Sequence, residues 1–380
     1  MINKIHIISF NIPYPPNYGG VIDVFYKIKA LHSLGVKIHL HCYQYGRDIS
    51  SELDEYCEKV YYYPRKNFFK SIYSHVPYIV GSRSSDDLMS NLLEDDNPIL
   101  FEGLHTCANL GHPHLKDRIK IVRMHNVEWD YYKSLGKAEQ NFFRKFYFYT
   151  ESFKLKHFEN ILNNANHILS ISPNDTEYLQ EKYSNAAYVT AFHSNENVNI
   201  NTGIGDYALY HGNLGVIENN QAAFYLIEKV FKKIDYPLKI AGKKPLDSLF
   251  KLVNKYDHIE LIPDPDFPQM LELIKNAHIN VLPTFQPTGI KLKLINALYN
   301  GRFCIVNNAM VENTGLQDLC IQVEDAKSTI SQIENFKDQP FTSKDIELRK
   351  KVLYQGFSNL ENAKKIINLI KSTELIDTKS

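Results

Sequence analysis

Two lysines and a Thr-Gly turn in the last third of the chain have the composition of a phosphate-binding site. The segment Thr288-Gly289-Ile290-Lys291 follows an apolar run at 279–282 and leads into a helical pattern that also carries Lys293. A loop that enters a helix leaves backbone N–H groups without intrahelical partners, and the helix dipole adds positive charge there. We therefore expect an anion such as a nucleotide phosphate to bind here. An ordinary turn with solvated lysines remains the alternative, because so short a motif is weak alone.

A similar arrangement opens the chain. Residues 5–10 form a short apolar run, and the loop after it ends at Gly19 and Gly20, before a helical pattern at 21–34. This order predicts a strand, a loop and a helix. The two glycines permit close approach of the backbone to an acceptor or a phosphate, although a tight turn would need them equally.

The composition excludes several classes of protein. With 43 basic and 43 acidic side chains in 380 residues the formal charge is zero, which argues against binding of nucleic acid by phosphate neutralisation. The five cysteines form no CxxC pair, which is typical of a reducing cytoplasm. No stretch approaches the roughly 20 apolar residues of a membrane span, and the N-terminus lacks a signal peptide. We expect a cytoplasmic protein, soluble or at most peripheral at the inner face of a membrane.

Strand and helix patterns alternate along the chain, which predicts an α/β protein with parallel sheets covered on both faces. A polar segment at 195–206 divides the strand-like apolar runs into two groups. The runs before it lie at 5–10, 36–42, 59–63, 98–101, 119–123, 167–171 and 187–190. The runs after it lie at 207–211, 238–241, 259–262, 279–282, 303–306 and 320–323. We expect two doubly wound, Rossmann-like domains, at 1–195 and 206–342. Residues 343–380 are expected to form a long C-terminal helix, able to pack back on the first domain, and a polar tail.

Aromatic and basic side chains are interleaved at 66–73 and at 142–149. This composition on a helix fits contact with a membrane surface. We favour packing between helices or domains instead, because the second cluster lies within a long helical pattern whose aromatic residues can serve as core.

Five motifs, in this order and spacing, together resemble glycosyltransferase family four, whose members have the GT-B fold of two Rossmann-like domains. They are the Pro-Tyr-Pro-Pro-Asn-Tyr-Gly-Gly loop ending at Gly20, Arg123-Met124-His125-Asn126-Val127-Glu128 with Tyr131-Tyr132, Ser172-Pro173-Asn174-Asp175, His211-Gly212-Asn213-Leu214, and Thr288-Gly289-Ile290-Lys291. The resemblance covers nearly the whole chain. It implies sugar transfer from a nucleotide diphosphate donor, held mainly by the second domain, to an acceptor held mainly by the first. No cofactor or metal is implied.

The residues that the resemblance assigns to donor binding are Asn213, Lys243, Thr288, Gly289, Ile290, Lys293 and Asn296, and the expected catalytic residues are His125 and Lys291. Cations and helix-end N–H groups suit this role, because the departing diphosphate gains negative charge that a metal-free site must stabilise. Several of these residues follow predicted strands, where open α/β sheets bind ligands. Lys243 could equally be a solvated turn lysine.

Thr288 and Asn296 stand where the family often has two glutamates. An amide can still bond a ribose hydroxyl, yet more weakly than a charged acceptor. The loss of both carboxylates keeps open the alternative of a non-catalytic GT-B scaffold subunit.

His125 follows a predicted strand and, by resemblance, contacts the donor sugar; capping of the next helix is its alternative. Glu128 is expected to occupy the first turn of that helix, although it could orient His125. Arg123 could be a cation of the site or a buried salt-bridge partner. The pairs His39/His41 and His112/His114 have no third ligand at a suitable spacing, so no metal site is expected.

The resulting prediction is a metal-independent glycosyltransferase that moves a sugar, a hexose with retained configuration by family resemblance, to a glycan or lipid-linked acceptor in cell-surface polysaccharide or glycoconjugate synthesis. A GT-B nucleotide-sugar epimerase is a further alternative, which would need acid/base carboxylates. A dinucleotide oxidoreductase is excluded because no GxGxxG follows Phe10.

Overall fold

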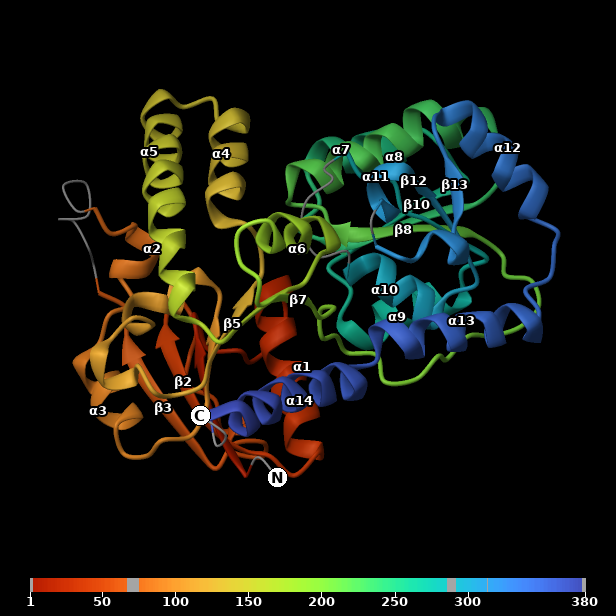
Figure 1. Ribbon diagram of the computed structural model, residues 1–380. Helices are drawn as coiled ribbons and strands as arrows, with labels where there is room; N and C mark the ends of the chain where they lie inside the picture. Colours follow the sequence, from red (N-terminus) through yellow and green to blue (C-terminus); the bar gives the residue numbers. More distant parts are fainter. Residues whose placement is uncertain (1–2, 67–74, 286–291, 313, 378–380) are drawn as a thin grey trace. The chain divides into compact units, whose positions relative to one another are not determined.

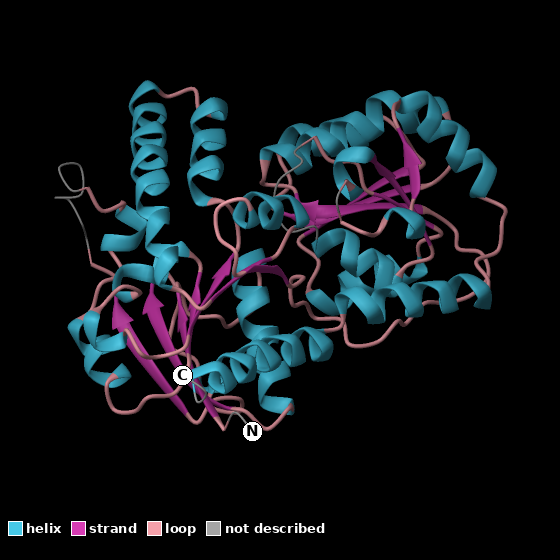
Figure 2. Cartoon of the chain, in the orientation of Figure 1, coloured by secondary structure: helices cyan, strands magenta, loops and turns pink. Residues whose placement is uncertain are grey.

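The computed structural model describes residues 3–66, 75–285, 292–312 and 314–377, which fall into two compact units (Figure 1). The N-terminal unit comprises residues 1–194 together with 357–380, and the C-terminal unit comprises residues 195–356. Each unit has a parallel sheet with helices on both faces (Figure 2). The predicted α/β class is confirmed, and the described strands agree with the predicted ones to within two residues at either end.

The N-terminal sheet has seven described strands in the order β3-β2-β1-β4-β5-β6-β7. Their bounds are β1 Lys4–Ser9, β2 Lys37–Gln44, β3 Lys59–Pro64, β4 Ile99–Glu102, β5 Lys120–Met124, β6 His167–Ser170 and β7 Ala186–Tyr188. In the central strand β1, Ile5, Ile7 and Ile8 are all buried, as expected for a strand covered on both faces.

Helices cover both faces of this sheet. Their bounds are α1 Gly19–Ser33, α2 Tyr78–Gly81, α3 Asp86–Leu92, α4 Glu128–Ala138, α5 Phe142–Phe158, α6 Pro173–Gln180 and α14 Asn359–Asp377. On one face, α1 buries Val24, Ile28 and Leu31 at helical spacing, and α14 adds Ile366 and Ile370 to the same core. Helices α4 and α5 pack side by side as a hairpin that projects from the rest of the unit (Figure 1).

The C-terminal sheet has six described strands in the order β10-β9-β8-β11-β12-β13. The strands are β8 Ala208–Asn213, β9 Leu238–Lys243, β10 Ile259–Pro263, β11 Ile279–Val281, β12 Phe303–Asn307 and β13 Ile321–Val323. The helices are α7 Ile217–Tyr225, α8 Asp247–Val253, α9 Phe267–Asn276, α10 Leu292–Asn300, α11 Asn308–Val311, α12 Ala326–Phe336 and α13 Ser343–Phe357. β8 and β9 approach so closely that a Cβ on Gly242 would lie 1.8 Å from the Gly212 carbonyl oxygen, which explains this glycine.

The long C-terminal helix predicted for residues 343–371 is in fact two helices. Ser358 separates α13 from α14, and its Oγ accepts the backbone N–H of Glu361 at 3.4 Å, the bond of an N-cap. Asn359 is anchored by the backbone N–H of His193, which donates to its Oδ1 at 3.1 Å. As a result α13 belongs almost entirely to the C-terminal unit and α14 to the N-terminal unit. No helix in the described ranges has the length and apolar character needed to cross a bilayer.

Candidate functional site

A buried cluster of four charged side chains supports the carboxyl ends of β4 and β5. The Arg123 guanidinium lies 2.9 Å from Asp23, and the Lys27 ammonium lies 2.8 Å from Asp23 and 2.7 Å from Glu102. All four side chains are fully buried. Burial opposes ionisation of Asp23, but the charges of Arg123 and Lys27 outweigh it and hold its pKa below the usual value. Of the two alternatives for Arg123, the structure therefore shows the buried salt-bridge partner.

His125 comes directly after β5 and is fixed by this cluster through one ring nitrogen. Its Nε2 lies 3.0 Å from Glu102 Oε2, whereas its buried Nδ1 has no hydrogen-bond partner among the described residues. Because a carboxylate only accepts, Nε2 carries a proton. Helix α4 begins after Val127 and no side chain of the described residues caps it, so His125 is not a helix cap. The structure thus leaves an oriented ring nitrogen, Nδ1, at the strand end.

Glu128 is the first residue of α4, as expected, but it is buried rather than solvated. Burial raises its pKa to about 8, a hydrogen bond from Asn126 opposes the shift, and the charge of Asp175 adds to it. Glu128 Oε1 has no hydrogen-bond partner and lies 3.7 Å from His105 Nδ1. At neutral pH this carboxyl is mostly protonated and can donate as well as accept a hydrogen bond.

His105 was missed by the sequence analysis. It lies in the 3-10 helix Leu104–Asn109 that follows β4, and its Nδ1 is a second buried nitrogen without a hydrogen-bond partner. Burial and the charge of Arg83 keep the pKa of His105 well below its usual value, so the ring is neutral. The signal that could have found it is its position just after the strand-like run at 98–101.

Gly19 and Gly20 form the first turn of α1, beside these histidines. The first N–H groups of any helix lack intrahelical partners. In α1 the N-cap residue, Tyr18, makes no capping bond to them with its side chain. A Cβ on Gly20 would lie 2.7 Å from the ring of Phe10, and that ring lies 5.5 Å from His125 and 5.6 Å from His105 between ring centroids. A side chain at position 20 would therefore displace the Phe10 ring, so packing gives a reason for this glycine that is independent of any ligand.

In the C-terminal unit, Asn213 and Lys243 are the last residues of β8 and β9 and are paired in register. The Lys293 ammonium donates to Asn219 Oδ1 at 2.7 Å, and Asn219 Nδ2 donates to the Asn213 carbonyl oxygen at 3.0 Å. His211, buried on β8, has its pKa lowered to about 3 by burial and by the charge of Lys293. The structure thus brings Asn213, Lys243 and Lys293 to one sheet edge and adds Asn219, which the sequence analysis missed.

Asn296 lies one turn after Lys293 on α10 and takes part in a network of amides. Its Oδ1 accepts from Asn195 Nδ2 at 2.8 Å, and Asn300 Nδ2 donates to Asn195 Oδ1 at 2.7 Å. Its assignment to the donor ribose stays a prediction. Thr288, Gly289, Ile290 and Lys291 lie outside the described residues, so the predicted helix-start site is represented here only by Lys293.

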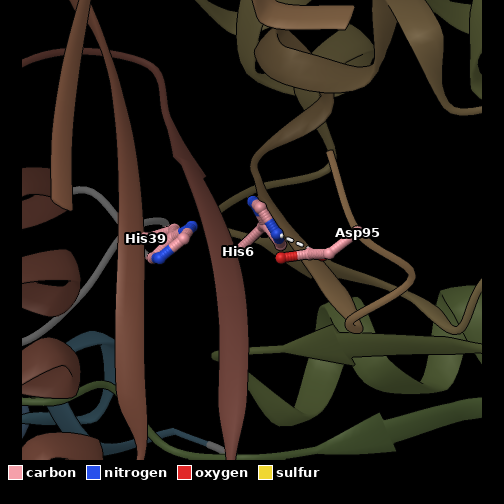
Figure 3. Close-up of side chains that lie close together, drawn as sticks. All are labelled: His6, His39 and Asp95. Atoms are coloured by element: carbon pink, nitrogen blue, oxygen red, sulfur yellow. Dashed lines mark hydrogen bonds and ion pairs between the residues drawn. The ribbon is translucent and has the colours of Figure 1, made fainter. Parts of the chain in front are cut away.

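His39 and His41 do lie near further polar side chains of β1 and its surroundings that the sequence analysis did not foresee. Figure 3 shows His39 with His6 and Asp95. His6 Nε2 lies 2.8 Å from Asp95 and His6 Nδ1 lies 2.9 Å from His41 Nε2, whereas His39 Nε2 lies 3.0 Å from Glu58. Both nitrogens of His6 are therefore used in hydrogen bonds. Lys4 and Arg118 lie 3.8 and 3.5 Å from Asp95 and already balance its charge. This arrangement fits a hydrogen-bonded sheet face better than a metal site.

Comparison with known proteins gives a match for most of the C-terminal unit. Residues 205–338 are similar to the family model described as glycosyl transferases group 1. Asn213, Lys243, Lys293 and Asn296 all lie within the matched residues.

The whole chain is also similar to complete proteins. It is 25% identical to the "uncharacterized 44.6 kDa protein in cps region" of Klebsiella pneumoniae, over 97% of this chain and 98% of that protein. A glycosyltransferase from Rickettsia africae has a TM-score of 0.65 at 12% identity, with 97% of this chain and 98% of that chain covered. Alr3699/HepE of Anabaena, in complex with UDP and glucose, has a TM-score of 0.64 at 10% identity, with 97% and 99% covered. These structures confirm the GT-B fold, whereas the assignment to family four stays a prediction.

Proposed function

We propose that the protein transfers a sugar from a nucleotide diphosphate sugar to a glycan or lipid-linked acceptor during synthesis of a cell-surface polysaccharide. The observation that carries this proposal is the group 1 match over residues 205–338, the part of the chain in which Asn213, Lys243 and Lys293 share one sheet edge. The relative in a cps region supports the polysaccharide context.

In this proposal the C-terminal unit holds the donor. Lys293, fixed by Asn219, and Lys243 at the end of β9 would meet the diphosphate, together with N–H groups of the segment before α10. Two ammonium groups can stabilise the negative charge that grows on the leaving diphosphate, so the proposed reaction needs no metal. Because solved proteins of the same fold contain UDP, uridine diphosphate is the first nucleotide to test.

The N-terminal unit would supply hydrogen bonds to sugar hydroxyls. Nδ1 of His125, in the neutral ring, would offer an acceptor, and the protonated carboxyl of Glu128 would offer a donor; neither His125 Nδ1 nor Glu128 Oε1 has a hydrogen-bond partner among the described residues. Such preorganised groups favour the transition state when they bond the reacting sugars more strongly there than in the ground state. Transfer with retained configuration, and a cytoplasmic location at the inner membrane face, complete the proposal.

A metal ion could also be considered at the Asp23, Glu102 and His125 side chains, because their ligand atoms lie within 4.8 Å of one another. Lys27 and Arg123 already neutralise both carboxylates, and His125 Nε2 points its proton at Glu102. These residues therefore do not fit a cation site, and we assign them to the positioning of His125.

Calorimetric titration tests the donor assignment. UDP, GDP and ADP should be compared with their monophosphates, and one diphosphate is expected to bind more tightly than its monophosphate because of the second charged group. If no nucleotide binds, the proposal fails, and the scaffold alternative gains support when an active partner co-purifies. Turnover of a nucleotide sugar without any acceptor, to a nucleotide sugar of altered configuration, would instead identify an epimerase.

A further inference from the structure

Four phenylalanine side chains on α5 are exposed over most of their surface. The exposed fraction is 74% for Phe142, 81% for Phe143, 66% for Phe146 and 65% for Phe153. We call these four residues the aromatic face of α5. Single exposed apolar residues are common, but several large ones gathered on one helix mark an interaction surface.

The aromatic face is not used to hold the hairpin together. Contacts with α4 come from other positions on α5: Ser152 Oγ donates to the Trp129 carbonyl oxygen at 2.6 Å, and Tyr149 packs over Gly136, where a Cβ would lie 3.3 Å from its ring. Leu155 is buried in the core beneath the hairpin. The contacts that hold α5 in place therefore do not explain why these four exposed positions are phenylalanine.

Basic side chains surround the turn of the hairpin. Residues 137–146 include three basic residues, Lys137, Arg144 and Lys145, and one acidic residue, Glu139. All three basic residues are exposed, and Arg144 lies 3.7 Å from Glu139, so the end of the hairpin keeps an excess of positive charge. Exposed phenylalanine rings can bury their surface in an apolar layer, and neighbouring lysine and arginine side chains can pair with anionic groups at the boundary of that layer.

We propose that the aromatic face of α5 and the basic residues of the hairpin turn dock on an anionic lipid bilayer. The phenylalanine rings enter the boundary between headgroups and acyl chains, and Lys137, Arg144 and Lys145 pair with lipid phosphates. The hairpin projects from the N-terminal unit, which gives this surface access to a bilayer (Figure 1). The proposal rests on the hairpin and does not depend on the transfer reaction.

Vesicle flotation of the full chain tests this inference. The protein should float with vesicles that contain phosphatidylglycerol, and less with phosphatidylcholine alone; raised salt should weaken the binding because it screens the lysine and arginine charges. Phe142→Ser combined with Phe143→Ser should reduce the partition coefficient about tenfold or more, given the apolar area that two rings remove from water. The matched control is Phe267→Ser combined with Tyr354→Ser, which removes two rings of 58% and 62% exposure from the C-terminal unit. This control should bind vesicles like the wild type.

Three results would overturn the inference. The first is equal flotation of the wild type and the Phe142/Phe143 variant, and the second is no flotation of the wild type. The third is a wild-type dimer in solution that the variant converts to a monomer, which would make the aromatic face an interface between copies. Thermal unfolding and nucleotide binding of the same preparations show whether the variant is folded, and they keep a failure here separate from a failure of the donor assignment.

Discussion

His125 is held through one nitrogen and leaves the other for a ligand, so its replacement should act on catalysis more than on folding. We expect His125→Ala to reduce sugar transfer about 100-fold while the nucleotide Kd changes little, because the bond to Nδ1 would be made chiefly in the transition state. His114→Ala, an exposed histidine of the same unit, is the control. A parallel fall of activity and Tm would show that His125 only stabilises the buried charge cluster.

Glu128 makes the stability of the N-terminal unit depend on pH in a defined direction. Its pKa is raised to about 8, whereas an unfolded glutamate titrates near its ordinary value of about 4.3. Between these values the unfolded chain loses the proton while the folded chain keeps it, so stability falls as pH rises, by at most about 1.4 kcal/mol per pH unit. Glu128→Gln should remove this dependence.

Fluorescence of the single tryptophan, Trp129, can follow urea unfolding of this unit from pH 5 to about pH 8. The advantage of Glu128→Gln over the wild type should grow with pH, whereas the exposed-residue control Glu181→Gln should show no such trend. A constant difference between Glu128→Gln and the wild type at all pH values would mean that Glu128 is ionised in the folded protein.

Lys293 is the described cation closest in sequence to residues 288–291 of the predicted phosphate site. Lys293→Ala should weaken binding of the nucleotide diphosphate by about 1.5–3 kcal/mol, the range for a hydrogen bond to a charged group, and should affect the monophosphate less. Lys255→Ala serves as the control, since Lys255 is exposed and precedes β10, at the opposite edge of the sheet. Equal Kd values for all three proteins would remove Lys293 from the donor site.

At the scale of elements, the strands could be predicted because burial on both faces leaves continuous apolar runs, such as residues 99–101 and 303–306. His125, Asn213 and Lys243 could be placed at sheet edges because each follows such a run. Helix ends were harder to predict. The break at Ser358 and the turn between α4 and α5, where Asn141 caps α5, depend on single hydrogen bonds within continuous helical patterns.

Contacts between distant segments could not be read from spacing. Arg123 and Asp23 are 100 positions apart, and the Lys293–Asn219 bond joins two helices 74 positions apart. The expectation that the aromatic residues of 142–149 are packed was wrong for Phe142, Phe143 and Phe146. Helical spacing shows which residues share a face, but not whether anything covers that face.

The amide network on α10 allows the ribose assignment of Asn296 to be tested against a structural role. Asn296→Ala should weaken donor binding by about 1 kcal/mol, the net value of a neutral hydrogen bond. Asn300→Ala disrupts the same network through its bond to Asn195 and should leave donor affinity unchanged. Asn296→Glu keeps an oxygen for Asn195 and should bind the donor at least as well as the wild type. Equal losses in the two alanine variants would show that the network only supports α10.

At the scale of the whole molecule, a formal charge of zero means that anion binding must come from local groups. Those groups are divided between two units: cations and amides at the carboxyl ends of the strands in the C-terminal unit, and buried nitrogen and carboxyl atoms without a hydrogen-bond partner among the described residues in the N-terminal unit. Because the proposed donor-binding and sugar-binding groups lie in different units, turnover should require the full chain.

The most direct test is release of nucleoside diphosphate from a panel of UDP-, GDP- and ADP-sugars by the full chain, with short lipid-linked saccharides as acceptors. One donor should be turned over only when an acceptor is present; Lys293→Ala should abolish most of this activity, and Lys255→Ala should retain it. A wild-type protein that binds no member of the panel and releases no nucleotide would contradict the assignment as a sugar transferase.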